Sequence, residues 1–94
     1  MRIGVLEVRL NLPGVRSLKE KRGIVKGLLE RIRNRFQVAA AEVDEINSKT
    51  PAGLGFSAVG NDSGTLQSRL RKVVEFIDAG GEGTVADFRV EILS

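Results

Sequence analysis

The residues of this chain whose types and spacing could do chemistry gather between Arg16 and Arg35. This segment holds 8 of the chain's 15 lysines and arginines and 2 of its 12 acidic residues, a local charge of +6. The remaining 7 cations and 10 acids give −3, so the overall charge of +3 hides a polarised chain. On a helix turning about 100° per residue, Lys19, Arg22, Lys26 and Arg33 would lie within about 60° of one another. Such a stripe is either a solvated helix face, which is common, or a surface that binds an anionic partner, and the repulsion between its stacked like charges favours the partner.

A serine beside lysines could also be a nucleophile with its activating base. Glu20, however, follows Ser17 by three residues, which is the spacing of a helix capping box. A capping serine accepts a backbone hydrogen bond, and a lysine on a solvated helix face is not activated as a base. The chain also contains no cysteine and no histidine. We therefore expect no catalytic residue and no enzymatic activity.

Two further kinds of chemical site are considered and disfavoured. Gly14-Val15-Arg16 lies where acylphosphatases hold a phosphate-binding loop, but the longer glycine-rich motif is missing and Pro13 lacks the N–H group that a cradle needs. Glu42, Asp44 and Glu45 could chelate Mg²⁺, but adjacent residues rarely converge on one ion, and a solvated acidic loop is the simpler interpretation. We expect no metal and no cofactor.

Hydrophobic periodicity predicts the elements that position the basic stripe. Alternation over 3–12 indicates a half-buried strand, which Pro13-Gly14 ends. The range 17–35 predicts an amphipathic helix with a buried stripe that includes Leu28 and Ile32. Strands are predicted over 36–43, 54–59 and 86–92, and a second helix capped by Asp62 or Ser63 runs to Ala79.

This βαββαβ order favours a ferredoxin-like α+β sandwich, in which a four-stranded antiparallel sheet of order 4-1-3-2 carries both helices on one face. We expect one domain over 1–94. The core between sheet and helices should comprise Leu6, Val8, Leu10, Leu28, Leu29, Ile32, Phe56, Leu70, Val73, Ile77, Phe88 and Val90.

The other face of the sheet should be open. All four phenylalanines are expected to be buried, so this face has no aromatic platform on which RNA bases could stack. Its mixture of apolar and oppositely charged residues suits a protein partner or a second copy of the chain. The predicted interface consists of Ile3, Val5, Glu7, Arg9, Val59, Asp87, Arg89 and Glu91.

The run from Leu12 to Arg22, LPGVRSLKEKR, resembles the YlxP-like family of small bacterial proteins, as do FQVAAAEV at 36–43 and Gly60-Asn61-Asp62. The resemblance covers essentially the whole chain and implies a ferredoxin-like fold. Genes of this family often neighbour those of transcription, translation-initiation and ribosome-maturation factors, which implies a ribosomal or RNA context. We therefore expect a cytoplasmic, non-membrane factor that binds rRNA or a ribosomal particle, and the hypothesised contacts are Arg16, Lys19, Arg22, Lys26 and Arg33.

Overall fold

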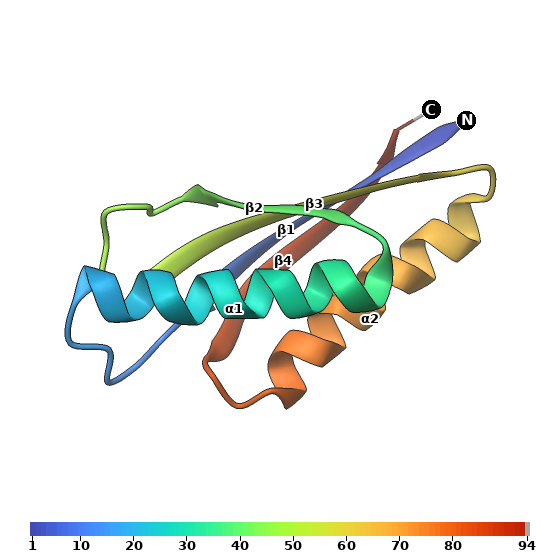
Figure 1. The fold of residues 1–94 in the computed structure, drawn as a ribbon. Helices are drawn as coiled ribbons and strands as arrows, with labels where there is room; N and C mark the ends of the chain where they lie inside the picture. Colours follow the sequence, from blue (N-terminus) through green and yellow to red (C-terminus); the bar gives the residue numbers. More distant parts are fainter. Residues whose placement is uncertain (94) are drawn as a thin grey trace.

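The computed structural model describes residues 1–93 as a four-stranded sheet with two helices on one face (Figure 1). In chain order the elements are β1 (Arg2–Asn11), α1 (Leu18–Phe36), β2 (Ala39–Asp44), β3 (Pro51–Gly60), α2 (Ser63–Ala79) and β4 (Thr84–Leu93). The sheet has the order β2-β3-β1-β4 and every neighbouring pair is antiparallel. The predicted ferredoxin-like α+β fold and its strand order are therefore confirmed.

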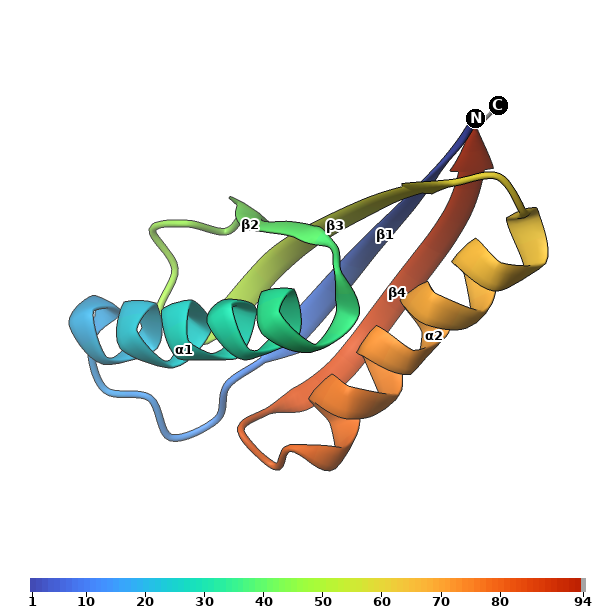
Figure 2. The same ribbon diagram turned by 45° about the vertical axis from the view of Figure 1, so that its right-hand side comes forward.

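The pleat of β1 divides the sheet into a dry face and an open face. Leu6, Val8 and Leu10 are buried under the helices, whereas Glu7 and Arg9 between them are exposed. The turned view shows α1 lying in front of β3 and α2 running beside β4 (Figure 2). The open face has no helix over it, because both βαβ crossovers lie on the same side.

Both helices begin at the residues that the sequence indicated. The Ser17 hydroxyl accepts a hydrogen bond from the Glu20 backbone N–H at 3.1 Å, and the Asp62 carboxylate accepts one from the Thr65 N–H at 2.8 Å. The Thr65 hydroxyl donates a second bond to Asp62. The pKa of the Asp62 carboxyl lies below its ordinary value of 3.8, mainly because the Thr65 hydroxyl donates to it. The Thr65 N–H and, to a smaller degree, the charge of Arg2 lower this pKa further. The cap is therefore in its charged form at neutral pH.

The boundary between α1 and β2 differs from the sequence prediction. Phe36 was expected to begin the second strand, but it ends α1, and Gln37 follows in the left-handed region with φ of 50°. That conformation closes a helix and redirects the chain, so β2 begins only at Ala39. The Phe36 ring packs edge-on against Phe76 of α2, with centroids 5.6 Å apart.

One member of the predicted core was wrong. Phe88 is 40% exposed, although it pairs with buried Val8 across the sheet and lies on the helix-covered face. β4 is an edge strand, and a bulge interrupts its pairing with β1 where Arg9 is followed by Leu10. Phe88 lines a depression of about 490 Å³ between β4 and α2 rather than the centre of the core. Val90 is half-buried and packs against the core, and the remaining predicted members are buried.

Candidate functional site

The five hypothesised RNA contacts all lie exposed on or just before α1. Arg16, Lys19 and Lys26 form no ion pair or side-chain hydrogen bond within residues 1–93. Arg22 reaches the Asn47 side-chain oxygen at 3.5 Å, and Arg33 donates to the backbone carbonyl of Ala40. In the part of the chain described, none of the five is neutralised by a carboxylate.

The other cations of α1 are used inside the molecule. Arg31 pairs with Glu82 in the connection before β4, and the Arg35 guanidinium lies 5.7 Å and 5.4 Å from the ring centroids of Phe36 and Phe76. The helix therefore carries two kinds of cation: one set that pairs with a carboxylate or an aromatic ring of the chain, and one exposed set that has no such partner within residues 1–93. We call the second set, Arg16, Lys19, Arg22, Lys26 and Arg33, the basic stripe.

Two glycines lie beside the basic stripe. A methyl group added at Gly23 or at Gly27 would meet no atom within 4 Å other than those of neighbouring residues and the helix backbone. Packing inside the molecule therefore does not require glycine at either position. Glycine inside a helix costs roughly 0.5–1 kcal/mol relative to alanine. Because neither glycine has a side chain, the helix backbone next to Lys19 and Lys26 is open to close approach by a bulky partner.

Lys21 is one of the lysines beside Ser17 that were expected on a solvated face of the helix, and for this residue the expectation was wrong. Its side chain is fully buried, and its Nζ lies 2.8 Å from Oε2 of Glu42 in β2. Nζ also donates to the backbone carbonyl of Glu45 at 2.5 Å. Glu42, expected in a solvated acidic loop, is a strand residue whose side chain is only 15% exposed. Its Oε2 makes no well-directed hydrogen bond, so charge alone holds the pair.

The Lys21 contact fixes the connection between β2 and β3. Glu45 has a φ of 57°, a conformation that side chains other than glycine rarely adopt. Its carbonyl accepts from Lys21, its carboxylate accepts from the Ser48 hydroxyl at 2.9 Å, and its N–H donates to Asp44. The Arg9 guanidinium approaches the same carboxylate at 3.4 Å from the open face. These four contacts hold Glu45 in its left-handed conformation.

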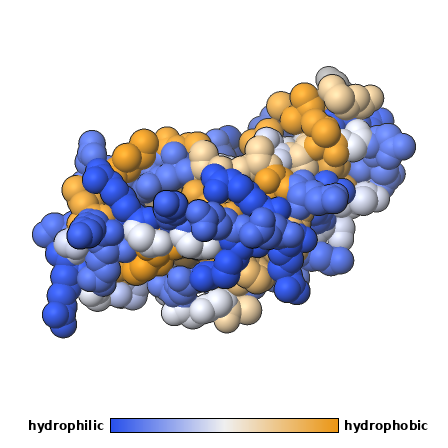
Figure 3. Space-filling view, viewed as in Figure 1, coloured by the Kyte–Doolittle hydropathy of each residue, from blue (hydrophilic) through white to orange (hydrophobic). Residues whose placement is uncertain are grey.

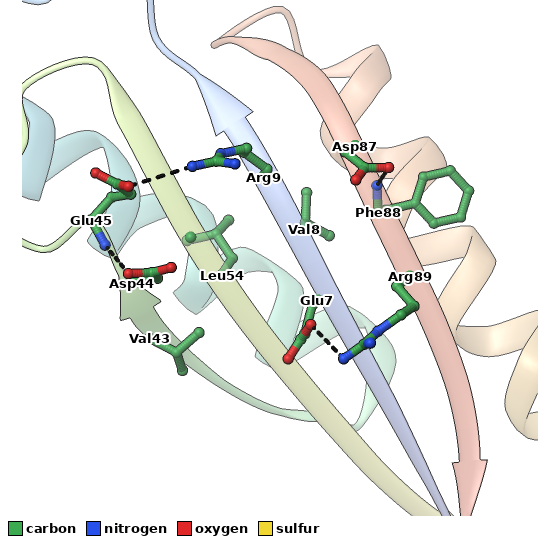
Figure 4. A pocket seen from close by; sticks show the side chains of 11 residues that line it. Glu7, Val8, Arg9, Val43, Asp44, Glu45, Leu54, Asp87, Phe88 and Arg89 are labelled. Carbon is green, nitrogen blue, oxygen red and sulfur yellow. Dashed lines mark hydrogen bonds and ion pairs between the residues drawn. The ribbon is translucent and has the colours of Figure 1, made fainter.

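The predicted open-face residues are brought together by the strand register. Glu7 pairs with Arg89 across β1 and β4, and their side chains form an exposed ion pair at 2.9 Å. Arg9 is in register with Asp87 on one side and with Gly53 on the other. Figure 4 shows that Arg9 extends across β3 toward Glu45, which is possible because Gly53 has no side chain in its path.

Glycines on β3 hollow out the open face. Gly53 and Gly55 face the same side as Glu7 and Arg9. Gly53 lines a depression of about 510 Å³ between the charged side chains (Figure 4), and Gly55 lines the next one along the strand. An adjoining depression of about 400 Å³ continues along β3, with Val5 and Ser57 among its lining. A methyl group added at Gly55 would be tightly packed against the Val43 side chain, whose nearest atom would be 3.0 Å away.

The open face becomes apolar toward the chain termini. Ile3 pairs with Val59 of β3 and with Leu93 of β4, and the three side chains are 37%, 60% and 44% exposed. Figure 3, which views the molecule from the side of α1, shows that hydrophilic residues cover most of that helix. Val5 and Glu91 make up the next row of the sheet. All eight predicted interface residues therefore belong to one surface, which is charged at one end and apolar at the other.

The residues that the sequence offered for catalysis or metal binding make other contacts in the structure. The Ser17 hydroxyl is occupied as a helix cap, and among residues 1–93 no three histidine, cysteine, aspartate or glutamate side chains converge as metal ligands would. The Asp44 carboxylate accepts a hydrogen bond from the Glu45 N–H, and the Glu45 carboxylate pairs with Arg9. Within the same residues, neither helix combines the length and apolar character needed to cross a bilayer.

Fold and surfaces together define a small ferredoxin-like α+β protein with an uncovered sheet face and a basic helix on the opposite side. Its residues 3–90 match a family described as "Protein of unknown function (DUF503)", and the chain belongs to this family. It is similar to a Bacillus subtilis (strain 168) protein described as "Uncharacterized protein YlxP", at 31% identity over 77 residues. That match covers 82% of this chain and 84% of the relative. The resemblance drawn from the SLKEKR run is thereby confirmed, and neither description names an activity.

Proposed function

We propose that this protein is a non-enzymatic factor that binds structured RNA or a ribosomal particle through the basic stripe of α1. The observation that carries the proposal is that some cations of α1 pair with carboxylates of the chain, whereas those of the basic stripe do not. Lys21 and Arg31 have carboxylate partners, whereas all five members of the stripe are exposed and lack one within the described chain. Stacked like charges repel by a few tenths of a kcal/mol per pair, a cost that an anionic partner would remove.

The chemistry of the stripe favours phosphate over base recognition. An arginine can bind a phosphate with two parallel hydrogen bonds, and a lysine acts as a point charge. Neither reads base identity unless it enters a groove, so binding should be electrostatic and weakly sequence-selective. The open helix backbone at Gly23 and Gly27 supports close approach of a nucleic-acid backbone. The ribosomal context implied by the family resemblance points to rRNA as the polyanion to try first.

The test compares two double variants that have the same net charge. Lys19→Glu/Lys26→Glu reverses two stripe residues that form no ion pair or side-chain hydrogen bond within residues 1–93. Arg71→Glu/Lys72→Glu reverses two exposed cations on α2. Binding to purified ribosomal subunits and to rRNA fragments is measured at several salt concentrations, and circular dichroism checks the fold of each variant.

Wild type should lose affinity steeply as salt rises. If four phosphates of a duplex are neutralised, the logarithm of the binding constant should fall with the logarithm of the salt concentration at a slope of roughly −3.6. The α1 variant should have a slope smaller in magnitude by about two. The α2 variant should bind nearly as wild type does. If the two variants bind equally well, or if wild type does not bind at low salt, the proposal is wrong.

A further inference from the structure

The open face carries an alternating pattern of charge that the sequence alone does not place. β1 presents Glu7 and then Arg9, and the β4 residues in register with them are Arg89 and Asp87. Each of these four charges therefore has the opposite charge next to it along its strand and across to the neighbouring strand. We call these four residues the charge quartet, and its net charge is zero.

An alternating quartet discriminates among partners. A polyanion such as RNA would meet two carboxylates among its four charges and would gain little from the quartet as a whole. A second copy of the same quartet, turned over by a two-fold axis lying in the interface, places each carboxylate opposite a guanidinium. This holds whether the axis runs along the strands or across them, because the signs alternate in both directions. The quartet is therefore complementary to itself, as a two-fold interface requires.

The rest of the open face agrees with a protein contact. Ile3, Val59 and Leu93 form an exposed apolar row at one end of the same surface. Four strands about 4.8 Å apart and eight residues of about 3.4 Å rise give a plane of roughly 500 Å². That area is somewhat below the roughly 800 Å² per partner of a standard interface, which indicates a reversible dimer of moderate affinity.

We propose that the open sheet face is the contact surface between two copies of this chain, with the charge quartets of the two copies facing each other. The guanidinium groups can take part because the side chains of Arg9 and Arg89 are 59% and 68% exposed and are held only by surface ion pairs. The surface lies on the side of the sheet away from α1, so this proposal stands or falls independently of RNA binding.

Sedimentation equilibrium of two charge reversals and of their mixture tests the proposal. Glu7→Arg changes the quartet from 0 to +2, and Arg89→Glu changes it to −2, so each variant repels its own copy. Both reversals break an exposed ion pair that adds little to stability, so the fold should survive. Lys26→Glu makes an equally large change of charge on α1, away from the open face, and is the matched control.

Wild type and Lys26→Glu should dimerise reversibly with similar dissociation constants. Each quartet reversal alone should weaken dimerisation by at least about tenfold, since like charges facing each other cost several kcal/mol. An equimolar mixture of the two reversals should associate again, because +2 then faces −2. A wild type that stays monomeric at its highest soluble concentration would overturn the proposal. Dimerisation that survives both single reversals would overturn it as well.

Discussion

Removing Glu42 should destabilise the protein more than removing any other charged side chain that we describe. Glu42→Leu would leave the Lys21 ammonium fully buried, with the Glu45 carbonyl as its one remaining partner. Stranding a buried charge in this way costs about 3–5 kcal/mol, out of the roughly 5–15 kcal/mol that holds a small domain together. Lys21→Met should cost less, about 1–3 kcal/mol, because the Glu42 carboxylate is 15% exposed and can turn toward water.

The double variant Lys21→Met/Glu42→Leu should recover most of that loss. Replacing both charges by apolar side chains of similar size removes the desolvation cost of each, and it also removes a buried Glu42 oxygen that makes no well-directed hydrogen bond. We expect its stability to lie within about 1 kcal/mol of wild type. The double-mutant cycle should then give a large coupling between the two positions.

Urea unfolding followed by circular dichroism measures these differences. With a slope of about 1 kcal/mol per molar urea for a small domain, a loss of 3 kcal/mol lowers the midpoint by about 3 M. Glu7→Gln, which breaks the exposed pair with Arg89, is the control and should cost at most about 1 kcal/mol. If Glu42→Leu costs no more than this control, Lys21 is not the buried ion that the structure describes and the argument is refuted.

Three further outcomes are expected. In urea unfolding, Leu28→Ala should cost about 2–5 kcal/mol, and Phe88→Ala should cost less because its ring is 40% exposed; equal costs would contradict this placement. Gly23→Ala and Gly27→Ala should each stabilise the fold by about 0.5–1 kcal/mol and yet weaken rRNA binding, whereas unchanged binding would exclude close approach at these glycines. The pKa of Asp62 is lowered in the folded protein, mainly by the threonine hydroxyl that donates to it, so its cap contribution is present above pH 3.8 and is lost as pH falls through the folded value. The stability difference between wild type and Asp62→Asn should therefore shrink in acid, and a difference that stays constant there would show that the charge is not what stabilises the cap.

The fold was predictable because each element buries one face with a distinct period. Alternation in β1 and the three- and four-residue spacing of Val25, Leu28 and Ile32 indicate which residues face the core. Caps at Ser17 and Asp62 place the helix starts to within a residue. These signals are local in sequence, so they do not depend on knowing how the elements pack.

Lys21 shows what was missed and which signal could have found it. It lies three residues after Leu18 and four before Val25, so it falls on the buried stripe even though its type suggests the surface. Glu42 likewise alternates with Ala40 on the helix side of β2. When two charged residues of opposite sign each fall on the otherwise apolar face of an element, the sequence pattern indicates a buried ion pair between them.

The exposure of Phe88 had no comparable signal. Its strand alternates regularly from residue 86 onward, and the neighbour directly across the sheet, Val8, is buried. Exposure depends on β4 being at the edge of the sheet and on the depression left where α2 passes it. Neither feature can be predicted from the spacing of residues along one strand.

The SLKEKR run therefore combines two roles that a sequence comparison cannot separate. Ser17 caps α1 and Lys21 ties that helix to β2, so both serve the fold. Lys19 and Arg22, on either side of Lys21, face solvent and have no carboxylate partner within residues 1–93. The exposed cations of the stripe, rather than the run as a whole, are the positions at which RNA binding has to be tested.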